Sequence, residues 1–375
     1  MNNSNRRTSH VARPTSMLEL SSIKLILTVF VGMALLGQGC FAPKKAVSPT
    51  GPDMGIWKSS DRGQTWVHKK ALINGPTLTA DAANFGVQAI EMDPQDRQAV
   101  YLGTIENGLV YTYDGGDSWQ RSAALEATDV RDVAIDSKNK CTVYAVSANK
   151  IYKTETCGRD WETAFFDPRT DKIFTQVVVD WFNPTIIYAG TDAGDIFKST
   201  DEGVSWQVVK RANANITHLV INPQDSRVIY AGTYGDGIWK SLDAGITWTQ
   251  IRKEFGDIGD ARRVLKIVPH PADASRFYLV HKDGIAMTPD NGATWEALTL
   301  VTDIGENKVT DLAIDNNDPS KMVYTGPTAL VFTQDAGKTW EVKKLPTANH
   351  GSVVLIDPAD GNNVYLGILP AKRTR

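Results

Sequence analysis

Six aspartates in this sequence occupy the same position in a short recurring pattern, S/T-x-D-x-G-x-T/S-W. They are Asp61, Asp114, Asp201, Asp243, Asp290 and Asp335. A recurring carboxylate could bind a cation or act as an acid or base. A local role is simpler: the aspartate accepts hydrogen bonds from backbone N–H groups of its own turn, the glycine adopts a conformation closed to other residues, and the tryptophan buries an apolar face. We therefore interpret these aspartates as structural.

Other residues that carry chemistry show no catalytic spacing. Six histidines are scattered without the spacing of metal ligands, and the sequence has no GxSxG, Walker or CxxC motif. The composition is 42% hydrophobic and 22% charged with a net charge of -3, and it contains neither a nucleic-acid-binding tract nor an acidic tail. We expect no metal, no cofactor and no nucleic-acid partner.

The pattern belongs to a longer repeat of about 45 residues. Between Trp206 and Trp248 the sequence predicts four short strands, rich in β-branched and aromatic residues and separated by Gly, Asp and Pro. A seventh copy of the pattern, TETCGRDW, has Thr156 in place of the aspartate, and the second-strand element (for example VIYAGT) also occurs seven times. Four antiparallel strands per repeat predict an all-β fold, a seven-bladed β-propeller.

The two ends of the repeat array are out of phase. The array begins with a third strand and a box at Gly55 to Trp66, and it ends with two strands at Ser352 to Ile368 and no box. Pairing of these segments would complete one shared blade and leave no open sheet edge. We predict a single propeller domain over residues 54–370, followed by a basic tail at 371–375.

The first 39 residues resemble a bacterial lipoprotein signal. Basic residues precede an apolar run from Leu25 to Leu36, and the run ends in Gly37-Gln38-Gly39-Cys40. The run is shorter than the roughly 20 residues that span a bilayer. We expect lipidation at Cys40 and a flexible tether over 40–53, with ordinary cleavage or an uncleaved anchor as alternatives and Met17 as an alternative start.

Two cysteines fall on the blade whose box lacks its aspartate. Cys141 precedes the second strand of that blade, and Cys157 lies in the turn between its third and fourth strands. Both connections lie on the same face of an antiparallel blade. We predict a disulfide that holds the turn, as suits an exported protein; two separate buried thiols are the alternative.

The inner strands align to give a polar column that should ring the mouth of the central channel. Its members are Asp132, Gln176, His218, Lys266 and Asp311, with Ala89 and Val353 in the other two places. Such a ring either recognises a ligand or is the solvated lining of a water-filled channel.

Basic residues gather in or beside the loops between blades. They are Arg121, Arg131, Arg169, Lys210, Arg211, Arg252, Lys253, Arg262 and Arg263. If they share one face, that face is positive and suits an anionic partner surface; ordinary solvated charge is the alternative. The loop from Arg252 to Arg263 is expected to protrude, and the stretch from Lys69 to Gly86 is comparable in length but less informative.

A carbohydrate-active protein is the competing functional class. Trp181, Phe182, Tyr234 and Trp239 could stack on sugars, although they also suit a blade core. A glycosidase needs two carboxylates about 5 to 10 Å apart, and Asp132 and Asp311 belong to blades well separated around the ring.

The repeat, and "VIYAGTYGDGIWKSLDAGITW" above all, resembles the Asp-box propeller superfamily. Within it the chain lacks the early Arg-Ile-Pro element of sialidases, and it has one propeller where xyloglucanases have two. In size, leader and blade count it is most similar to photosystem II stability and assembly factor-like proteins, and sortilin-type propellers are a further non-enzymatic group. This resemblance implies a non-catalytic, monomeric protein at the cell envelope, lipid-anchored, that binds a protein such as a membrane protein; a glycan ligand is the alternative.

Overall fold

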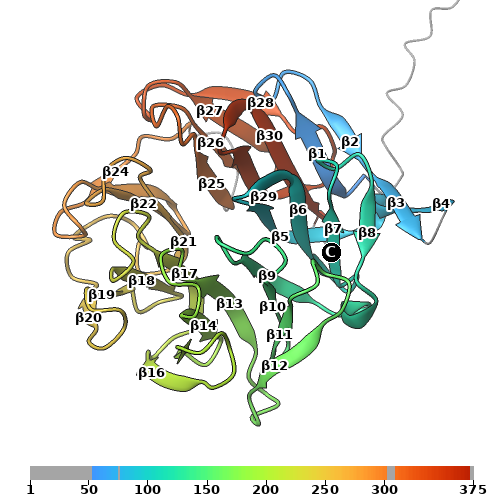
Figure 1. Ribbon diagram of the computed structural model, residues 1–375. Coiled ribbons are helices and arrows are strands. Elements are labelled where there is room, and N and C mark those ends of the chain that lie inside the picture. Colours follow the sequence, from blue (N-terminus) through green and yellow to red (C-terminus); the bar gives the residue numbers. More distant parts are fainter. Residues whose placement is uncertain (1–52, 75–76, 302–308, 372–375) are drawn as a thin grey trace, which may run out of the picture. The chain divides into compact units, whose positions relative to one another are not determined.

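The computed structural model describes residues 53–74, 77–301 and 309–371, so the leader, Cys40 and most of the basic tail lie outside the described residues. The described chain forms seven sheets around a central axis, each with a core of four antiparallel strands (Figure 1). This confirms the predicted all-β, seven-bladed propeller. Two single-turn helices, η1 (Ala82–Asn84) and η2 (Ala123–Leu125), interrupt the strands, and in these ranges no helix is long and apolar enough to cross a membrane.

We number the blades around the ring from the one that holds both ends of the propeller, and each runs from an inner strand at the channel to an outer strand at the rim. Blade 1 contains β29 (His350–Asp357), β30 (Asp360–Leu369), β1 (Gly55–Ser59) and β2 (Val67–Lys69). Blade 2 contains β5 (Gly86–Asp93), β6 (Asp96–Ile105), β7 (Leu109–Thr112) and β8 (Trp119–Arg121). Blade 3 contains β9 (Val130–Ile135), β10 (Val143–Ser147), β11 (Lys150–Thr154) and β12 (Glu162–Phe166).

The remaining four blades repeat this plan. Blade 4 contains β13 (Phe174–Val179), β14 (Ile187–Thr191), β15 (Asp195–Ser199) and β16 (Gln207–Arg211). Blade 5 contains β17 (Ile216–Ile221), β18 (Ile229–Thr233), β19 (Ile238–Ser241) and β20 (Thr249–Ile251). Blade 6 contains β21 (Val264–Pro269), β22 (Phe277–His281), β23 (Gly284–Thr288) and β24 (Glu296–Ala297), and blade 7 contains β25 (Asp311–Ile314), β26 (Met322–Thr325), β27 (Ala329–Thr333) and β28 (Glu341–Lys344).

Blade 1 closes the ring as the sequence predicts. Strands β1 and β30 pair antiparallel, with Ile56 opposite Gly367 and Lys58 opposite Tyr365. Figure 1 shows these two strands, from opposite ends of the sequence, side by side. Each inner strand also contacts the inner strand of the next blade all the way round. The sheet edges at the two ends of the repeat array therefore satisfy each other.

Blade 2 carries an additional hairpin that the sequence did not predict. Strands β3 (Ala71–Asn74) and β4 (Thr77–Asp81) pair with each other, and β3 joins β8 in a parallel pair with Leu72 opposite Trp119. Leu72 and Trp119 are both buried in one apolar cluster. Burial of Leu72 explains why this stretch forms a strand instead of a loop.

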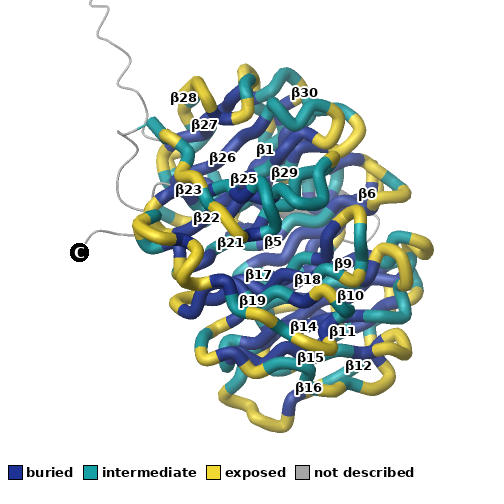
Figure 2. Tube along the Cα trace, turned by 90° about the vertical axis from the view of Figure 1, so that its left-hand side faces the viewer, coloured by how far each residue is buried: buried dark blue, intermediate teal, exposed yellow. Residues whose placement is uncertain are grey.

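The core lies between neighbouring blades. Five of the second strands are buried along their whole length, as in β14 and β18, whereas the outer strand β16 is half-buried with exposed ends (Figure 2). Each apolar cluster draws side chains from adjacent sheets; one of them joins Tyr144 of blade 3 to Ile187 of blade 4. The hydrophobic effect thus stabilises the seams between blades.

Six inner strands contain a β-bulge immediately before the channel position. Four of the extra residues, and Thr310 at the matching place in blade 7, donate a hydrogen bond to a backbone carbonyl of the next blade. The pairs are Ser352 to Val87 (2.6 Å), Gln88 to Val130 (2.9 Å), Thr175 to Ile216 (2.6 Å), Thr217 to Val264 (2.8 Å) and Thr310 to Gly351 (3.1 Å).

The other two extra residues are Arg131 and Leu265, and at those junctions the channel residue itself makes the bridge. Asp132 Oδ2 of blade 3 accepts a hydrogen bond from the Val177 N–H of blade 4 at 2.9 Å. Lys266 of blade 6 forms an ion pair with Asp311 of blade 7 at 2.5 Å. A polar side chain near the channel mouth therefore bridges every junction of the ring.

The Asp box is a closed hydrogen-bonded turn, as its residues suggest. In blade 5, Asp243 Oδ1 accepts from the Thr247 N–H (2.8 Å) and the Ser241 hydroxyl (2.8 Å), and Oδ2 accepts from the Thr247 hydroxyl (2.6 Å). These hydrogen bonds lower the pKa of Asp243 to about 2, and the bond from the Thr247 hydroxyl contributes most. The other five box aspartates make the same set of bonds.

The box also fastens one blade to the next. The residue before the box glycine is left-handed, with a φ of 57° at Ala244, and its carbonyl accepts from the Tyr188 hydroxyl (2.8 Å) and from Lys198 (2.8 Å) of the preceding blade. Tyr144 makes the equivalent bond to the Glu202 carbonyl at 2.9 Å. The recurring tyrosine of the second strand is thus a contact between blades.

The box of blade 3 is held differently. Thr156 replaces the aspartate, and its hydroxyl oxygen accepts the Asp160 N–H at 2.9 Å. The structure joins Cys141 and Cys157 in a disulfide, and the Cys157 N–H donates to the Cys141 carbonyl at 3.2 Å. The covalent link ties this turn to the start of β10.

The bridges near the channel predict a measurable loss on substitution. Thr217→Val keeps the shape of the side chain but leaves the Val264 carbonyl without its partner, so the free energy of unfolding should fall by about 1–3 kcal/mol. Thr163→Val, at an exposed position of β12, should change it by less than about 0.5 kcal/mol. Urea denaturation measures both, and equal effects would contradict the bridging role.

Candidate functional site

The propeller has two unlike faces. We call the face with the Asp boxes and the turns between first and second strands the box face. The loops that connect blades and the turns between second and third strands lie at the opposite ends of the strands, and we call that side the loop face. The candidate site predicted from the sequence lies on the loop face and at the channel mouth.

The structure brings the predicted channel residues together. They line one cavity of about 310 Å³ at the start of the inner strands, together with Glu91 and with the bulge residues of every bulged blade except blade 4. The members from the polar column are Asp132, Gln176, His218, Lys266 and Asp311, with Ala89 and Val353 completing the ring as expected. The alignment of the inner strands therefore placed these side chains at one level of the channel.

Most of these polar groups already have partners in the fold. Asp311 Oδ2 accepts the Val354 N–H at 2.9 Å, while its Oδ1 pairs with Lys266 and accepts its neighbour's N–H. His218 Nδ1 accepts the Ile267 N–H at 3.4 Å. Besides lining for a ligand or for water, the column therefore has a third role, which is to hold neighbouring blades together.

Glu91 is a channel residue that the sequence comparison missed. It lies two positions after Ala89 on β5 and therefore on the same side of the strand. The spacing of two residues from Ala89 could have identified Glu91 as a channel residue. It was missed because the alignment compared only one position in each inner strand. Burial, and next the nearby Asp132, raise the pKa of Glu91 to about 8. Burial likewise raises the pKa of Asp132 to about 7.

His218 completes the electrostatics of the channel. Burial and the neighbouring Lys266 lower the pKa of His218 to about 3, so its ring is neutral near pH 7. Glu91 is largely protonated at that pH for the reason given above. Near pH 7 the channel therefore combines a largely protonated Glu91, a partly ionised Asp132, a neutral imidazole and one close ion pair, which makes it polar but weakly charged.

Arg131 stands out at this mouth because the other bulge residues are smaller or uncharged. Its Nε is buried and has no hydrogen-bond partner among the described residues, and its Nη2 lies 4.0 Å from Asp129 Oδ2. The side chain is 37% exposed. It could donate hydrogen bonds to a ligand at the mouth.

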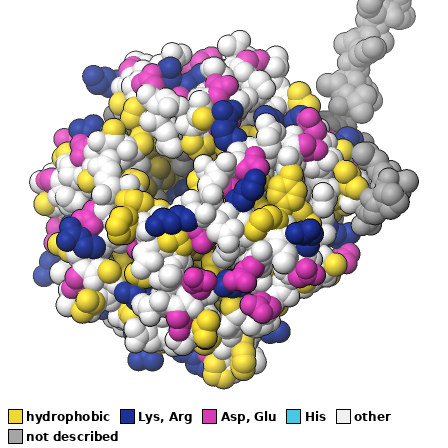
Figure 3. All heavy atoms as spheres, viewed as in Figure 1, with side chains coloured by type: hydrophobic (Ala, Val, Ile, Leu, Met, Phe, Trp, Pro, Cys, Tyr) yellow, Lys and Arg dark blue, Asp and Glu magenta, His cyan; other side chains and the backbone are white. Residues whose placement is uncertain are grey.

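The basic loops are largely neutralised, which departs from the expected positive face. Arg169 contacts both Asp167 and Asp195, at 2.7 Å for Asp195, and Arg211 reaches Asp195 at 3.2 Å. The same holds for Arg252 with Asp236 (2.9 Å), Arg263 with Asp260 (2.8 Å) and Arg121 with Glu126 (3.3 Å). Figure 3 shows Lys and Arg side chains interspersed with Asp and Glu on the face in view. Lys210 and Arg262 make no ion pair within the described ranges.

The proposed sugar-stacking aromatics have separate positions and separate partners. Trp181 donates its Nε1 hydrogen to the Asn222 carbonyl of the next blade at 2.9 Å, on the box face. Trp239 packs in the core beneath Lys210, whose Nζ lies 3.3 Å from the ring centroid. Phe182 is 65% exposed and Tyr234 is 48% exposed. Blade packing and junctions thus account for both tryptophans, and the four residues form no single platform.

The long loop between β20 and β21 is anchored. Phe255 and Ala261 are buried, and the Phe255 ring lies 4.9 Å from that of Trp295. The loop borders a cavity of about 740 Å³ that also includes Arg252 and Arg262. Its basic residues are therefore held on a fixed frame.

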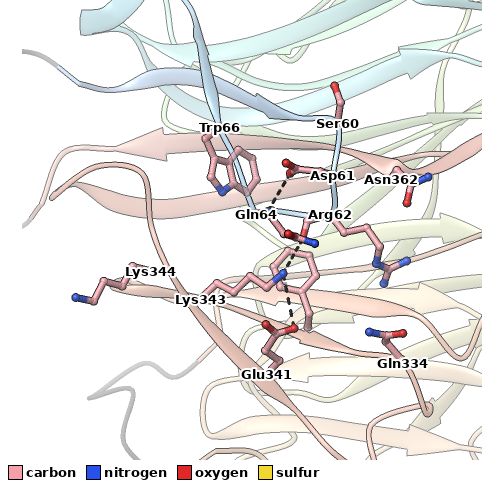
Figure 4. A pocket seen from close by; sticks show the side chains of 12 residues that line it. Ser60, Asp61, Arg62, Gln64, Trp66, Gln334, Glu341, Lys343, Lys344 and Asn362 are labelled. Carbon is pink, nitrogen blue, oxygen red and sulfur yellow. Dashed lines mark hydrogen bonds and ion pairs between the residues drawn. The ribbon is translucent and has the colours of Figure 1, made fainter.

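A larger cavity, of about 950 Å³, lies away from the predicted site, on the box face between blades 1 and 7 (Figure 4). Its lining is mostly polar, and half of the twelve lining residues are exposed. Lys343 crosses it to the Arg62 carbonyl (3.0 Å), and Asp61 is occupied by its own box. These contacts are those of a seam between blades. Among the described residues no cluster of His, Cys, Asp and Glu could hold a metal ion.

Comparisons with known proteins confirm the resemblance to Asp-box propellers. Residues 236–349 match the family model described as Sortilin, neurotensin receptor 3. The chain is 35% identical over 163 residues to the xyloglucanase Xgh74A of Acetivibrio thermocellus, which covers 42% of this chain and 16% of that enzyme.

Solved structures resemble the chain over 76% of its length. The GH74 xyloglucanase of Xanthomonas campestris superimposes with a TM-score of 0.63 at 16% identity, over 51% of that chain. A structure described as YCF48 bound to D1 peptide gives a TM-score of 0.60 at 18% identity, over 93% of that chain. Likeness at this identity concerns the fold.

The raised pKa of Glu91 predicts how stability depends on pH. In the unfolded chain this carboxyl ionises near pH 4.5, but in the fold it keeps its proton until about pH 8. Its contribution to stability is therefore complete below about pH 4 and is lost as the pH rises through about 8. Glu91→Gln should make the fall of the melting temperature between pH 5 and 8 shallower, whereas Glu296→Gln, at an exposed position, should leave the slope unchanged. Identical slopes for Glu91→Gln and wild type would contradict the assignment.

Proposed function

We propose that this protein is a non-catalytic, membrane-tethered propeller of the cell envelope that binds a protein partner through its loop face. The observation that carries the proposal is the set of arginines held in place by aspartates across blades 3 to 6. Arg169, Arg211 and Arg252 remain 41%, 74% and 46% exposed while their carboxylate partners are nearly buried. Guanidinium groups fixed in this way keep outward donors and lose little conformational entropy on binding.

Exposed aromatic side chains on the same face support protein binding. Phe166, at the end of β12, is 59% exposed, and Tyr234 is 48% exposed with the Arg263 guanidinium 5.7 Å from its ring centroid. Tyrosine and arginine are enriched at the energetic centres of protein interfaces. The near-neutral charge of the face favours a partner recognised through hydrogen bonds and aromatic packing, with bulk charge secondary.

The similarity to YCF48 points in the same direction. That protein, in the structure described as bound to D1 peptide, is covered over 93% of its length. A single propeller that receives a polypeptide segment is therefore a suitable precedent. The leader ending at Cys40 adds a membrane anchor to this proposal.

A glycan-active protein is the second candidate, because the xyloglucanase Xgh74A is 35% identical over 163 residues. Two features of the channel limit this alternative: Asp311 is paired with Lys266, and Asp132 bridges to blade 4. If the chain hydrolyses xyloglucan, Glu91 and Asp132 are the carboxyls to test first. Release of reducing sugar that is lost in Glu91→Gln would overturn the non-catalytic proposal.

If the partner binds the loop face, substitutions on that face should weaken binding, and substitutions on the box face should not. The triple variant Arg211→Glu, Tyr234→Ala, Arg262→Glu should lower recovery of the partner by about tenfold or more in affinity capture from native membranes. The matched variant of the box face, Lys338→Glu with Ile246→Ala, should recover it like wild type. Quantitative mass spectrometry measures both. If only the box-face variant failed to recover the partner, the partner would bind the box face, which would contradict this proposal.

The anchor is tested separately. Cys40→Ala should abolish incorporation of labelled palmitate and move the protein from the membrane fraction to the soluble fraction, because one thiol carries the lipid. The propeller itself should keep its melting temperature. Membrane retention of Cys40→Ala without label would instead indicate an uncleaved apolar anchor.

A further inference from the structure

A buried aspartate recurs at the end of the inner strands, and in two blades an arginine from the following blade completes it. In blade 1, Asp357 Oδ1 accepts the Ala359 N–H of its own turn, while Oδ2 pairs with Arg97 of blade 2 at 2.9 Å. In blade 7, Asp315 Oδ2 lies 3.7 Å from Arg62 of blade 1. The turn thus uses one carboxylate oxygen, and the neighbouring blade supplies a guanidinium to the other.

Asp93 of blade 2 lacks this completion. Its Oδ1 accepts the Gln95 N–H at 2.8 Å, but its Oδ2 is buried and has no hydrogen-bond partner among the described residues. The residue is 1% exposed. Lys140 holds the place in blade 3 that Arg97 holds in blade 2, and its Nζ instead pairs with Asp96 at 3.3 Å. A buried carboxylate oxygen without a donor is costly, so the site is suited to receive one.

A cavity of about 410 Å³ lies beside this carboxylate, on the box face next to the box that lacks its aspartate. Asp93 and the aromatic rings of Tyr111 and Tyr113 line it, and Asp96, Lys140 and Arg159 also border it. Tyr113 is held in place, because its hydroxyl donates to the Cys157 carbonyl and its ring packs against Tyr111 with centroids 5.5 Å apart. The cavity therefore has aromatic walls and an unsatisfied acceptor.

We propose that this pocket binds the guanidinium group of an arginine side chain from another molecule, which donates to Asp93 Oδ2 as Arg97 does to Asp357. A guanidinium is planar, offers several N–H donors and stacks on aromatic rings, which matches a carboxylate beside two tyrosines. Lys140 and Arg159 near the opening disfavour a ligand with a second positive charge. The site lies on the box face and is independent of the partner proposed for the loop face.

Calorimetric titration with N-acetyl-arginine amide tests the proposal, with N-acetyl-citrulline amide as the neutral ligand of the same shape. The arginine amide should bind the wild type at least about tenfold more tightly than the citrulline amide, and Asp93→Asn should remove that difference. Lys140→Arg should supply the guanidinium internally, raising the melting temperature and blocking the probe. Asp357→Asn, the matched control, should lower the melting temperature and leave probe affinity unchanged.

Two results would overturn the proposal. One is equal affinity of the arginine amide for wild type and Asp93→Asn, with the fold of both verified by circular dichroism. The other is that the probe fails to bind the wild type at millimolar concentration but binds Lys140→Ala, which would mean that Lys140 fills the site itself. Tighter binding of the arginine amide than of free arginine would support an arginine within a polypeptide, and tighter binding of free arginine would support the free amino acid.

Discussion

The stability of a ring of seven sheets depends on the junctions between neighbouring blades. In this protein a polar side chain near the channel mouth bridges each junction. Thr217 donates to the carbonyl of Val264, and Lys266 pairs with Asp311, in each case across a seam. The bulges in the inner strands place these side chains, since the extra residue interrupts the ladder beside the next blade. Within the polar column, Asp132, Lys266 and Asp311 therefore already hold neighbouring blades together before any ligand is considered.

The Asp boxes also hold neighbouring blades together, at the outer part of the ring. Their aspartates bind their own turns, and the carbonyl before the box glycine accepts the tyrosine of the preceding blade, as Ala244 does with Tyr188. Most of the recurring polar residues thus have hydrogen-bond partners within the fold. The side chains left for function are the arginines of the loop face, which stay exposed, and the buried Asp93, whose Oδ2 has no donor among the described residues.

The repeats in the sequence sufficed to predict the blades, the shared first blade and the level of the channel residues, because those follow from strand periodicity. Partners across seams could not be predicted, since residues about 40 positions apart meet only after the ring closes. Arg211 was taken as open charge for a different reason: its partner Asp195 lies directly opposite it on β15 of the same blade, and that strand register was not assigned from the sequence. The hairpin at Leu72 was missed because its burial depends on Trp119 of another strand pair. The predicted disulfide between Cys141 and Cys157 is formed in the structure because both turns lie on the box face.

The central claim, that the loop face receives the partner and the box face does not, is open to one direct measurement. A photo-crosslinking amino acid would be placed at Phe166 or Tyr234 on the loop face and at Val204 or Ile246 on the box face, all of which are exposed. In living cells, irradiation should join the partner to the protein from Phe166 and Tyr234 alone. Crosslinks to the same partner from Val204 and Ile246, with none from the loop face, would contradict the account.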